Sequence, residues 1–179
     1  MRAAVITLGA LGCLALAWRP SPPRLMWNTT ASVPVGLYRL EPPGQPGLGD
    51  LVVVSPPPEI ARLLADRDWL PSGVPLLKPV AAGPGQRVCR QGQAVTIDGL
   101  IVARAALEDA RRRPLPAWEG CRRLAANEVF LLSPEVGSFD GRYLAMTPTT
   151  SILALAKPLL TARPDAEGRL GAPGTRARR

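Results

Sequence analysis

Apolar positions in the middle of the chain come in short runs separated by glycine and proline. The run Leu51–Val54 is aliphatic and lies between a Gly-Asp pair and three consecutive prolines, which predicts a buried strand. Residues 129–132 have the same character. Residues 94–97 and 100–103 flank an Asp-Gly dipeptide, a strong signal for a β-hairpin. Short strands between turns predict a mainly β, antiparallel domain.

Three other segments in this region have different patterns. Residues 59–69 place Ile60 and two leucines at helical spacing, which predicts a short amphipathic helix. Residues 142–146 are a further candidate strand. Residues 104–123 are rich in arginine and proline and poor in apolar side chains, so we expect them to form a surface excursion.

The two ends of the chain lie outside this pattern. Within residues 1–18 nothing after Arg2 is charged, and the segment is slightly short of the about 20 apolar residues that span a membrane. It fits either an N-terminal apolar helix that stays as a signal anchor or a cleavable signal peptide, because an Ala-Leu-Ala sequence near its end suits a cleavage site. Residues 19–27 predict a Pro-rich spacer. Residues 163–179 predict a basic, disordered tail, leaving 28–162 as the folded domain.

Histidine is absent from all 179 residues. Its absence excludes Ser-His-Asp and Cys-His enzymes and the common zinc sites that use imidazole ligands. Acid–base chemistry near neutral pH must therefore come from a lysine, carboxylate, tyrosine or cysteine with a shifted pKa. The net charge of +8 comes almost wholly from arginine. No recognisable nucleic-acid-binding motif accompanies that charge, so we expect no nucleic-acid partner.

Lys78 and Lys157 are the only lysines in the sequence. Lys78 follows two leucines and precedes Pro-Val-Ala-Ala. Lysine is rarely buried, and burial among apolar side chains would lower its pKa towards the range in which the amine can act as a base. Lys157 stands next to a proline near the basic tail, where we expect its charge to reach solvent.

Ser32 is the candidate nucleophile, since Ser-Lys pairs are a known variant of the catalytic triad. It lies between small residues and a Pro-x-Gly turn, and by local sequence alone this segment could equally be an ordinary polar loop. Asp140 precedes a glycine; it is either part of an ordinary turn or a carboxylate that orients the lysine, with Arg142 as its structural partner.

Cys89 and Cys121 are the two cysteines outside the N-terminal apolar segment. In an exported domain such a pair predicts a disulfide, which would tie the excursion to the β core. In a cytosolic protein the same two residues would be buried thiols.

Four motifs occur in an order that resembles the serine signal peptidases and, within them, the conjugative-transfer type called TraF. They are Ser-x-Pro-x-Gly-Leu-Tyr, Gly-Asp-Leu-Val, Leu-Leu-Lys-x-Val-Ala-Ala-x-Pro-Gly and Ser-Phe-Asp-x-Arg-Tyr, spread over residues 28–160. The resemblance implies Ser32 as nucleophile, Lys78 as general base and Asp140 as an assisting carboxylate. It also implies that Thr30 contributes to an oxyanion hole beside the Ser32 backbone N–H.

The same resemblance implies a mainly β catalytic domain of signal-peptidase type beside the membrane, with no metal or organic cofactor. Its function would be serine endopeptidase processing of an exported precursor, the pilin subunit of a conjugative type IV secretion system, with other conjugation-pore proteins as further partners. The catalytic domain would face the periplasm from the inner membrane, or be soluble in the periplasm after leader removal. The alternatives are a general type I signal peptidase and a non-catalytic scaffold of the secretion complex. Pro79, Gln86 and Gly141 depart from the family pattern.

Overall fold

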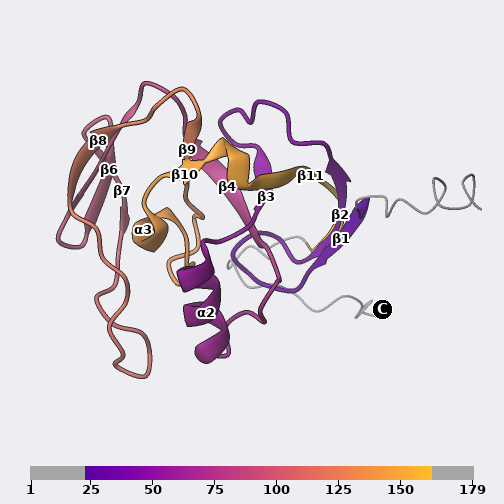
Figure 1. The fold of residues 1–179 in the computed structure, drawn as a ribbon, viewed down its shortest axis with the longest axis horizontal. Helices are drawn as coiled ribbons and strands as arrows, with labels where there is room; N and C mark the ends of the chain where they lie inside the picture. Colours follow the sequence, from indigo (N-terminus) through magenta and orange to yellow (C-terminus); the bar gives the residue numbers. More distant parts are fainter. Residues whose placement is uncertain (1–22, 163–179) are drawn as a thin grey trace, which may run out of the picture.

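The structure is a computed structural model that describes residues 23–162. The predicted signal segment 1–18 and the predicted tail 163–179 lie outside the described residues. In chain order the elements are β1 (Leu25–Asn28), β2 (Gly36–Glu41), β3 (Leu51–Val54), α2 (Pro58–Asp66), β4 (Leu76–Ala82), β5 (Arg87–Gln91), β6 (Ala94–Ile97), β7 (Leu100–Arg104), β8 (Gly120–Arg123), β9 (Glu128–Leu131), α3 (Gly141–Leu144), β10 (Thr147–Pro148), a 3-10 turn (Thr149–Ser151) and β11 (Ile152–Thr161) (Figure 1).

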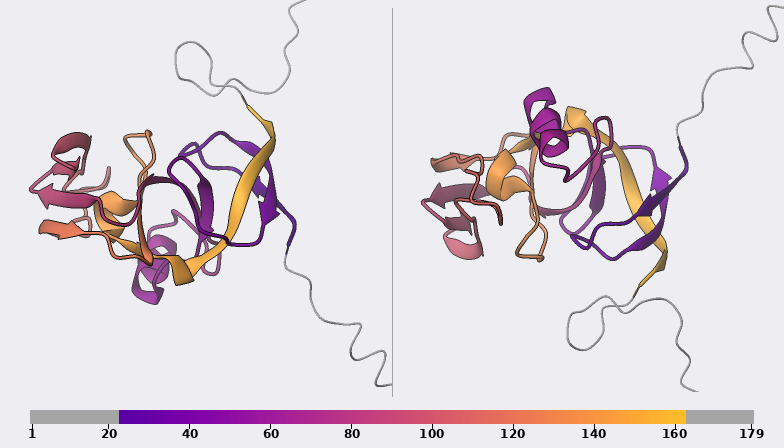
Figure 2. Two further views of the ribbon diagram at one scale, coloured as in Figure 1. Left: turned by 90° about the horizontal axis from the view of Figure 1, so that it is seen from above. Right: turned by 90° about the horizontal axis from the view of Figure 1, so that it is seen from below.

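The strands form two antiparallel sheets. The larger has seven strands in the order β1-β2-β11-β3-β4-β9-β10, and the smaller has four in the order β7-β6-β5-β8. The smaller sheet stands at one end of the molecule, and β1 and β2 stand at the other (Figures 1 and 2). This arrangement confirms the mainly antiparallel β fold, including the hairpin of β6 and β7.

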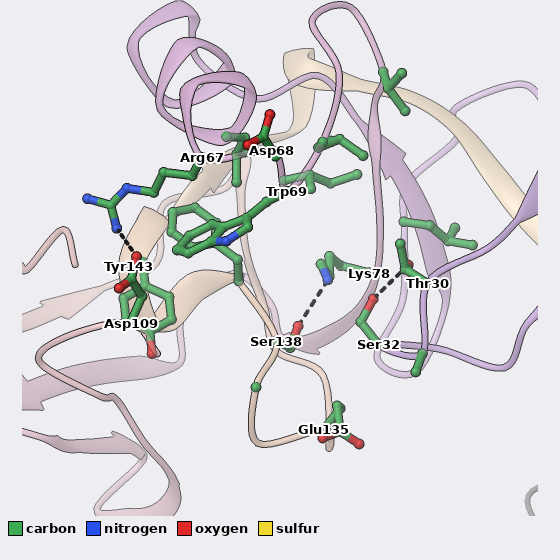
Figure 3. Close-up of a pocket in the computed structure, with 18 of the residues that line it drawn as sticks. Thr30, Ser32, Arg67, Asp68, Trp69, Lys78, Asp109, Glu135, Ser138 and Tyr143 are labelled. Carbon is green, nitrogen blue, oxygen red and sulfur yellow. Dashed lines mark hydrogen bonds and ion pairs between the residues drawn. The ribbon is translucent and has the colours of Figure 1, made fainter. Parts of the chain in front are cut away.

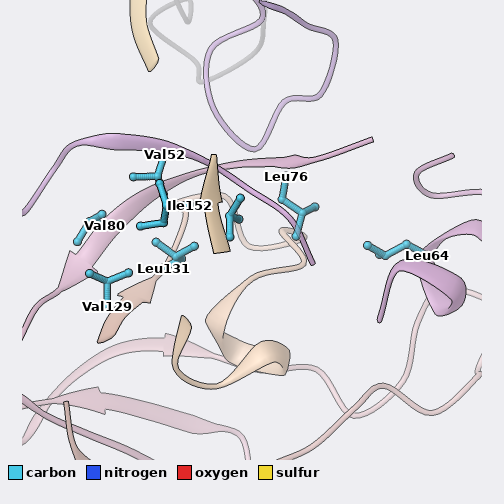
Figure 4. Close-up of a cluster of buried hydrophobic side chains, with 8 residues drawn as sticks. Val52, Leu64, Leu76, Val80, Val129, Leu131 and Ile152 are labelled. Atoms are coloured by element: carbon cyan, nitrogen blue, oxygen red, sulfur yellow. The ribbon is translucent and has the colours of Figure 1, made fainter. Parts of the chain in front are cut away.

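The core explains why β3 has no polar alternation. Val52 and Val54 pack in one buried cluster, drawn in Figure 4, and Val53 packs in another on the opposite face. A strand buried on both faces needs a continuous aliphatic sequence. A third cluster, which includes Val88 and Phe130, joins the smaller sheet to the larger one.

The predicted amphipathic helix is α2, although it ends at Asp66 instead of residue 69. It starts with Pro58 in its first turn, where the missing N–H costs no helical hydrogen bond. Leu64 is the buried residue of its apolar face. Asp68 has a positive φ of 58°, a left-handed conformation that ends helices, so Trp69 lies beyond the helix.

One predicted element and one predicted boundary were wrong. Residues 142–146 do not form a strand; the chain forms the short helix α3, because the Asp140 side chain accepts a hydrogen bond from the backbone N–H of Arg142 at 3.1 Å and so caps a helical turn. The predicted spacer 19–27 also extends too far towards the C-terminus. The strand β1 begins at Leu25 and pairs with β2.

The smaller sheet is cross-linked by a disulfide between Cys89 and Cys121, which confirms that prediction. The two cysteines lie directly opposite each other on β5 and β8. The predicted excursion 104–123 therefore ends in a strand of this sheet, while its middle part forms a loop closed by a bridge between Glu108 and Pro114.

Candidate active site

Ser32 lies in the loop between β1 and β2, and one buried side chain organises that loop. Asn28, the last residue of β1, places its amide nitrogen 2.8 Å from the carbonyl oxygen of Thr30 and 3.2 Å from those of Val33 and Pro34. An amide that contacts three carbonyls of one loop restricts its backbone, and thereby the position of the partly buried Ser32.

The Pro-x-Gly-Leu-Tyr motif fixes the other side of the same loop. The hydroxyl of the buried Tyr38 donates a 2.5 Å hydrogen bond to the carbonyl oxygen of Pro34. Gly36 has a φ of 148°, and a Cβ at this position would lie 2.1 Å from the Leu160 carbonyl oxygen. The close approach of β2 to β11 therefore requires glycine here.

Lys78 lies on β4, and its side chain is almost wholly buried, with 5% exposed. Its Nζ donates a 2.9 Å hydrogen bond to the hydroxyl of Ser138 (Figure 3). Burial lowers the pKa of Lys78 to about 8, opposed in part by the negative charge of Asp140. The sequence expectation of a buried lysine with a lowered pKa is consistent with this environment.

Ser32 and Lys78 line one cavity of about 1000 Å³. Within residues 23–162 no hydrogen bond joins the two side chains. The Ser32 hydroxyl instead lies 3.4 Å from that of Thr30, and the lysine amine is held by Ser138. The cavity therefore contains a hydroxyl and a buried amine that a peptide bond placed between them could contact.

Asp140 and Arg142 form a buried ion pair, with Nη1 of the arginine 2.7 Å from Oδ2 of the carboxylate. This confirms Arg142 as the structural partner of Asp140. The carboxylate also accepts a hydrogen bond from the backbone N–H of Ser133 at 2.9 Å, and none joins it to Lys78 in the described part of the chain. Burial raises the pKa of the Asp140 carboxyl, and the arginine charge opposes that effect. The charge of Asp140 acts on the pKa of Lys78, and Ser138, which accepts the lysine hydrogen bond, also contributes to the environment of the Asp140 carboxyl.

Thr30 uses its hydroxyl hydrogen within its own loop. Its Oγ1 donates to the Asn28 side-chain oxygen at 2.9 Å. A hydroxyl has one hydrogen to donate, so a contribution of Thr30 to an oxyanion hole requires this bond to be exchanged when substrate binds. That role stays a prediction.

The second lysine, Lys157, differs from Lys78 in its exposure to solvent and in the direction of its pKa shift. Lys157 has 42% of its side chain exposed and forms a 2.9 Å ion pair with Asp50. This hydrogen bond raises the pKa of Lys157, so its amine stays charged at neutral pH.

Three residues that hold this site together do not stand out in the sequence. Asn28 and Ser138 lie inside the segments that carry the candidate residues, and a polar residue that is buried there must have partners. Ser133, also buried, donates a hydrogen bond to the carbonyl oxygen of Ser32. Only the fold reveals these pairings.

The chain matches the family described as "Signal peptidase, peptidase S26" over residues 1–160, and it belongs to that family. It is 37% identical over 171 residues to the "Probable conjugal transfer protein TraF" of Sinorhizobium fredii, covering 90% of this chain and 88% of the relative. It is 35% identical over 148 residues to the "Conjugal transfer protein TraF" of Agrobacterium tumefaciens, covering 76% and 82%. A "Plasmid transfer protein TraF" of Escherichia coli is 31% identical over 147 residues, covering 75% and 81%.

A crystal structure of a signal peptidase I from Enterococcus faecalis also matches. The TM-score is 0.37 at 16% identity, covering 63% of this chain and 97% of that chain. Family membership therefore stands on the sequence matches, and these place the chain among proteins similar to the TraF proteins of conjugal transfer.

Proposed function

We propose that this protein is a serine endopeptidase in which Ser32 is the nucleophile and Lys78 the general base. The neutral amine takes the Ser32 proton as Oγ attacks the scissile carbonyl carbon. It then gives that proton to the leaving amine, and an ester between Ser32 and the substrate remains. Water, deprotonated by the same amine, hydrolyses the ester and restores Ser32.

The observation that carries this proposal is the burial of Lys78 in the cavity that Ser32 also lines. With a pKa of about 8, about one tenth of the amine is neutral at pH 7, compared with fewer than one in a thousand for an ordinary lysine. Ser138 accepts one of the amine hydrogens, which limits the orientations that the nitrogen can adopt.

For the substrate we propose an exported precursor, the pilin subunit of a conjugative type IV secretion system. The names of the relatives, which are conjugal or plasmid transfer proteins, support a dedicated peptidase over a general signal peptidase. A non-catalytic scaffold of the secretion complex is the alternative from a different class, and the experiment below separates it from both enzymes.

We further propose that the protein works beside the inner membrane with its catalytic domain in the periplasm. Among residues 23–162 there is no helix with the length and apolar character needed to cross a bilayer. Support comes from the sheet edge: Trp27 and Leu160 both pair with Leu37 on β2, so the three side chains share one face. Trp27 is 60% exposed and Leu160 68%, which suits contact with an apolar surface.

The test compares conversion of a precursor by three single variants and one double variant, with circular dichroism as a check of folding. Ser32→Ala and Lys78→Arg should each abolish conversion, because arginine keeps the charge but cannot be deprotonated in a protein. Lys157→Arg is the matched control and should convert normally. The double variant of Ser32 and Lys78 should be little worse than either single one, as expected for groups that act on one proton. Near-normal conversion by Lys78→Arg would exclude Lys78 as the general base, whereas a lack of conversion by the unaltered protein would favour the scaffold.

A further inference from the structure

The cavity is larger than the space between Ser32 and Lys78. It continues past the lysine to Trp69, beyond the end of α2, and to the loop 106–115 of the excursion. In Figure 3 the Trp69 indole lies between the Lys78 side chain and the ion pair of Arg67 with Asp109. A volume of about 1000 Å³ is at the upper end for ligand pockets, so it can hold several side chains of an extended peptide.

Trp69 is held in place from two sides. The guanidinium of Arg67 lies 5.1 Å from its ring centroid and that of Arg113 lies 5.8 Å away. The ring of Phe139 packs against it with a centroid distance of 5.8 Å, and Phe139 directly follows the Ser138 that binds the lysine. Despite these contacts Trp69 keeps 37% of its surface exposed. An indole that only filled the core would be buried.

The two arginines beside Trp69 are both bound by one carboxylate. Asp109 accepts hydrogen bonds from the side chains of Arg67 at 3.2 Å and Arg113 at 2.7 Å. Arg67 also donates to the carbonyl oxygen of Pro114 at 2.7 Å. These contacts tie the excursion to the end of α2, and they occupy both arginines, which favours an apolar ligand over an anionic one.

We propose that this far end of the cavity, the Trp69 wall (Trp69, Val74, Leu115 and Phe139), binds an apolar side chain of the substrate several residues from the scissile bond. The inference rests on the proposed peptidase function. Val74 is 38% exposed, so the wall presents apolar surface that a substrate side chain can cover. The cavity continues past Lys78 to Trp69 and an extended chain advances about 3.3 to 3.6 Å per residue, so a side chain at the wall belongs to a residue beyond the two that the scissile bond joins.

The excursion would then help to select substrates, because its loop forms one side of the cavity. Because the Asp109 contacts hold the loop against α2, loss of Asp109 should open the wall without touching Ser32 or Lys78. The wall would thus distinguish substrates by residues outside the immediate cleavage sequence.

The test uses two peptides copied from this chain, because its residues 15–17, Ala-Leu-Ala, suit a signal-peptidase cleavage site. The long peptide has the sequence of residues 4–24, with apolar residues far from the cleavage site, and the short one that of residues 13–20. Binding is measured by calorimetry on protein carrying Ser32→Ala, so no turnover is needed. Trp69→Ala should weaken binding of the long peptide about tenfold, Trp69→Phe should restore most of it, and short-peptide binding should not change.

Leu107→Ala is the matched control, since Leu107 is 56% exposed on the same excursion and does not line the cavity; it should bind both peptides normally. Equal binding of the two peptides by the protein with intact Trp69, an equal loss for both peptides in Trp69→Ala, or no loss for either overturns the Trp69 wall. Labelling of Ser32 by a small acylating probe, measured in protein with Ser32 intact, tests the peptidase function separately. It should be unaffected by Trp69→Ala, and its absence would count against the catalytic proposal alone.

Discussion

The hydroxyl of Ser133 donates a hydrogen bond to the backbone carbonyl oxygen of Ser32. Ser133 is in turn fixed by the buried ion pair, since its N–H donates to Asp140 and its carbonyl oxygen accepts a 2.9 Å hydrogen bond from Arg142. The loop that carries Ser32 is thus attached to the segment that also contributes Ser138, the partner of Lys78. We infer that Ser133 is a positioning residue for Ser32, the proposed nucleophile.

Ser133→Ala should lower kcat by about 10- to 100-fold with little change in KM, because a small displacement of a reacting group is costly while peptide binding is retained. Ser133→Thr keeps the hydroxyl and should recover much of the rate, which a purely structural effect of lost packing would not predict. Ser151→Ala is the control, since the Ser151 hydroxyl donates a similar bond to Pro148 on an exposed turn. Steady-state kinetics on one peptide substrate measures all three, and an unchanged kcat in Ser133→Ala would contradict the positioning role.

Asp140→Ala should lower the free energy of unfolding by about 3 to 5 kcal/mol, because it leaves the Arg142 charge buried without its partner. Arg142 is 3% exposed, so water cannot replace the carboxylate. The measurement is urea unfolding at pH 7. A control, Asp50→Ala, removes the carboxylate of the half-exposed pair with Lys157 and should cost less than about 1 kcal/mol. An equal loss of stability in the two variants would show that the buried pair contributes no more to folding than the half-exposed one.

The sequence predicted those features that follow from local patterns. The strand Leu51–Val54 was identifiable because a strand buried on both faces has a continuous aliphatic sequence, and Lys78 stood out because leucines precede the charge. The contacts of Ser133 and Ser138 were not predictable, since they join residues 101 and 60 positions apart. The strand predicted at 142–146 failed because a side-chain cap at Asp140 decides between helix and strand there.

Reduction of the Cys89–Cys121 disulfide should lower the free energy of unfolding by roughly 3 to 4 kcal/mol, the chain-entropy value for a loop of about 30 residues. The bonded strand β8 has only exposed residues, so little packing replaces the cross-link. Chemical unfolding with and without reductant gives the difference, and Cys89→Ser with Cys121→Ser reproduces it without reductant. The double serine variant should show no further response to reductant. Full labelling of both cysteines in the unfolded, non-reduced protein would show that the bond does not form.

The buried amine of Lys78 should give both activity and stability a dependence on pH around 8. Its pKa is about 8 in the folded protein, compared with 10.5 for a lysine side chain in water, so kcat/KM should rise with pH up to about 8 and then level off, because only the neutral amine is a base. Between about pH 8 and 10.5 the unfolded chain holds more of this proton than the folded protein does. The linkage relation then requires stability to increase with pH in that window.

From pH 7 to pH 10 the free energy of unfolding of the wild type should therefore rise by about 2 to 3 kcal/mol relative to Lys78→Met. The difference between the two proteins removes the contributions of all other titrating groups. Lys157→Met is the control. The pKa of Lys157 is raised by Asp50, so its contribution to stability is present throughout this range and is lost only as pH rises through that raised pKa. Urea unfolding at pH 7, 8, 9 and 10 supplies the data. Parallel curves for the wild type and Lys78→Met would mean that Lys78 has an ordinary pKa, and a base with an ordinary lysine pKa would be almost wholly charged at neutral pH.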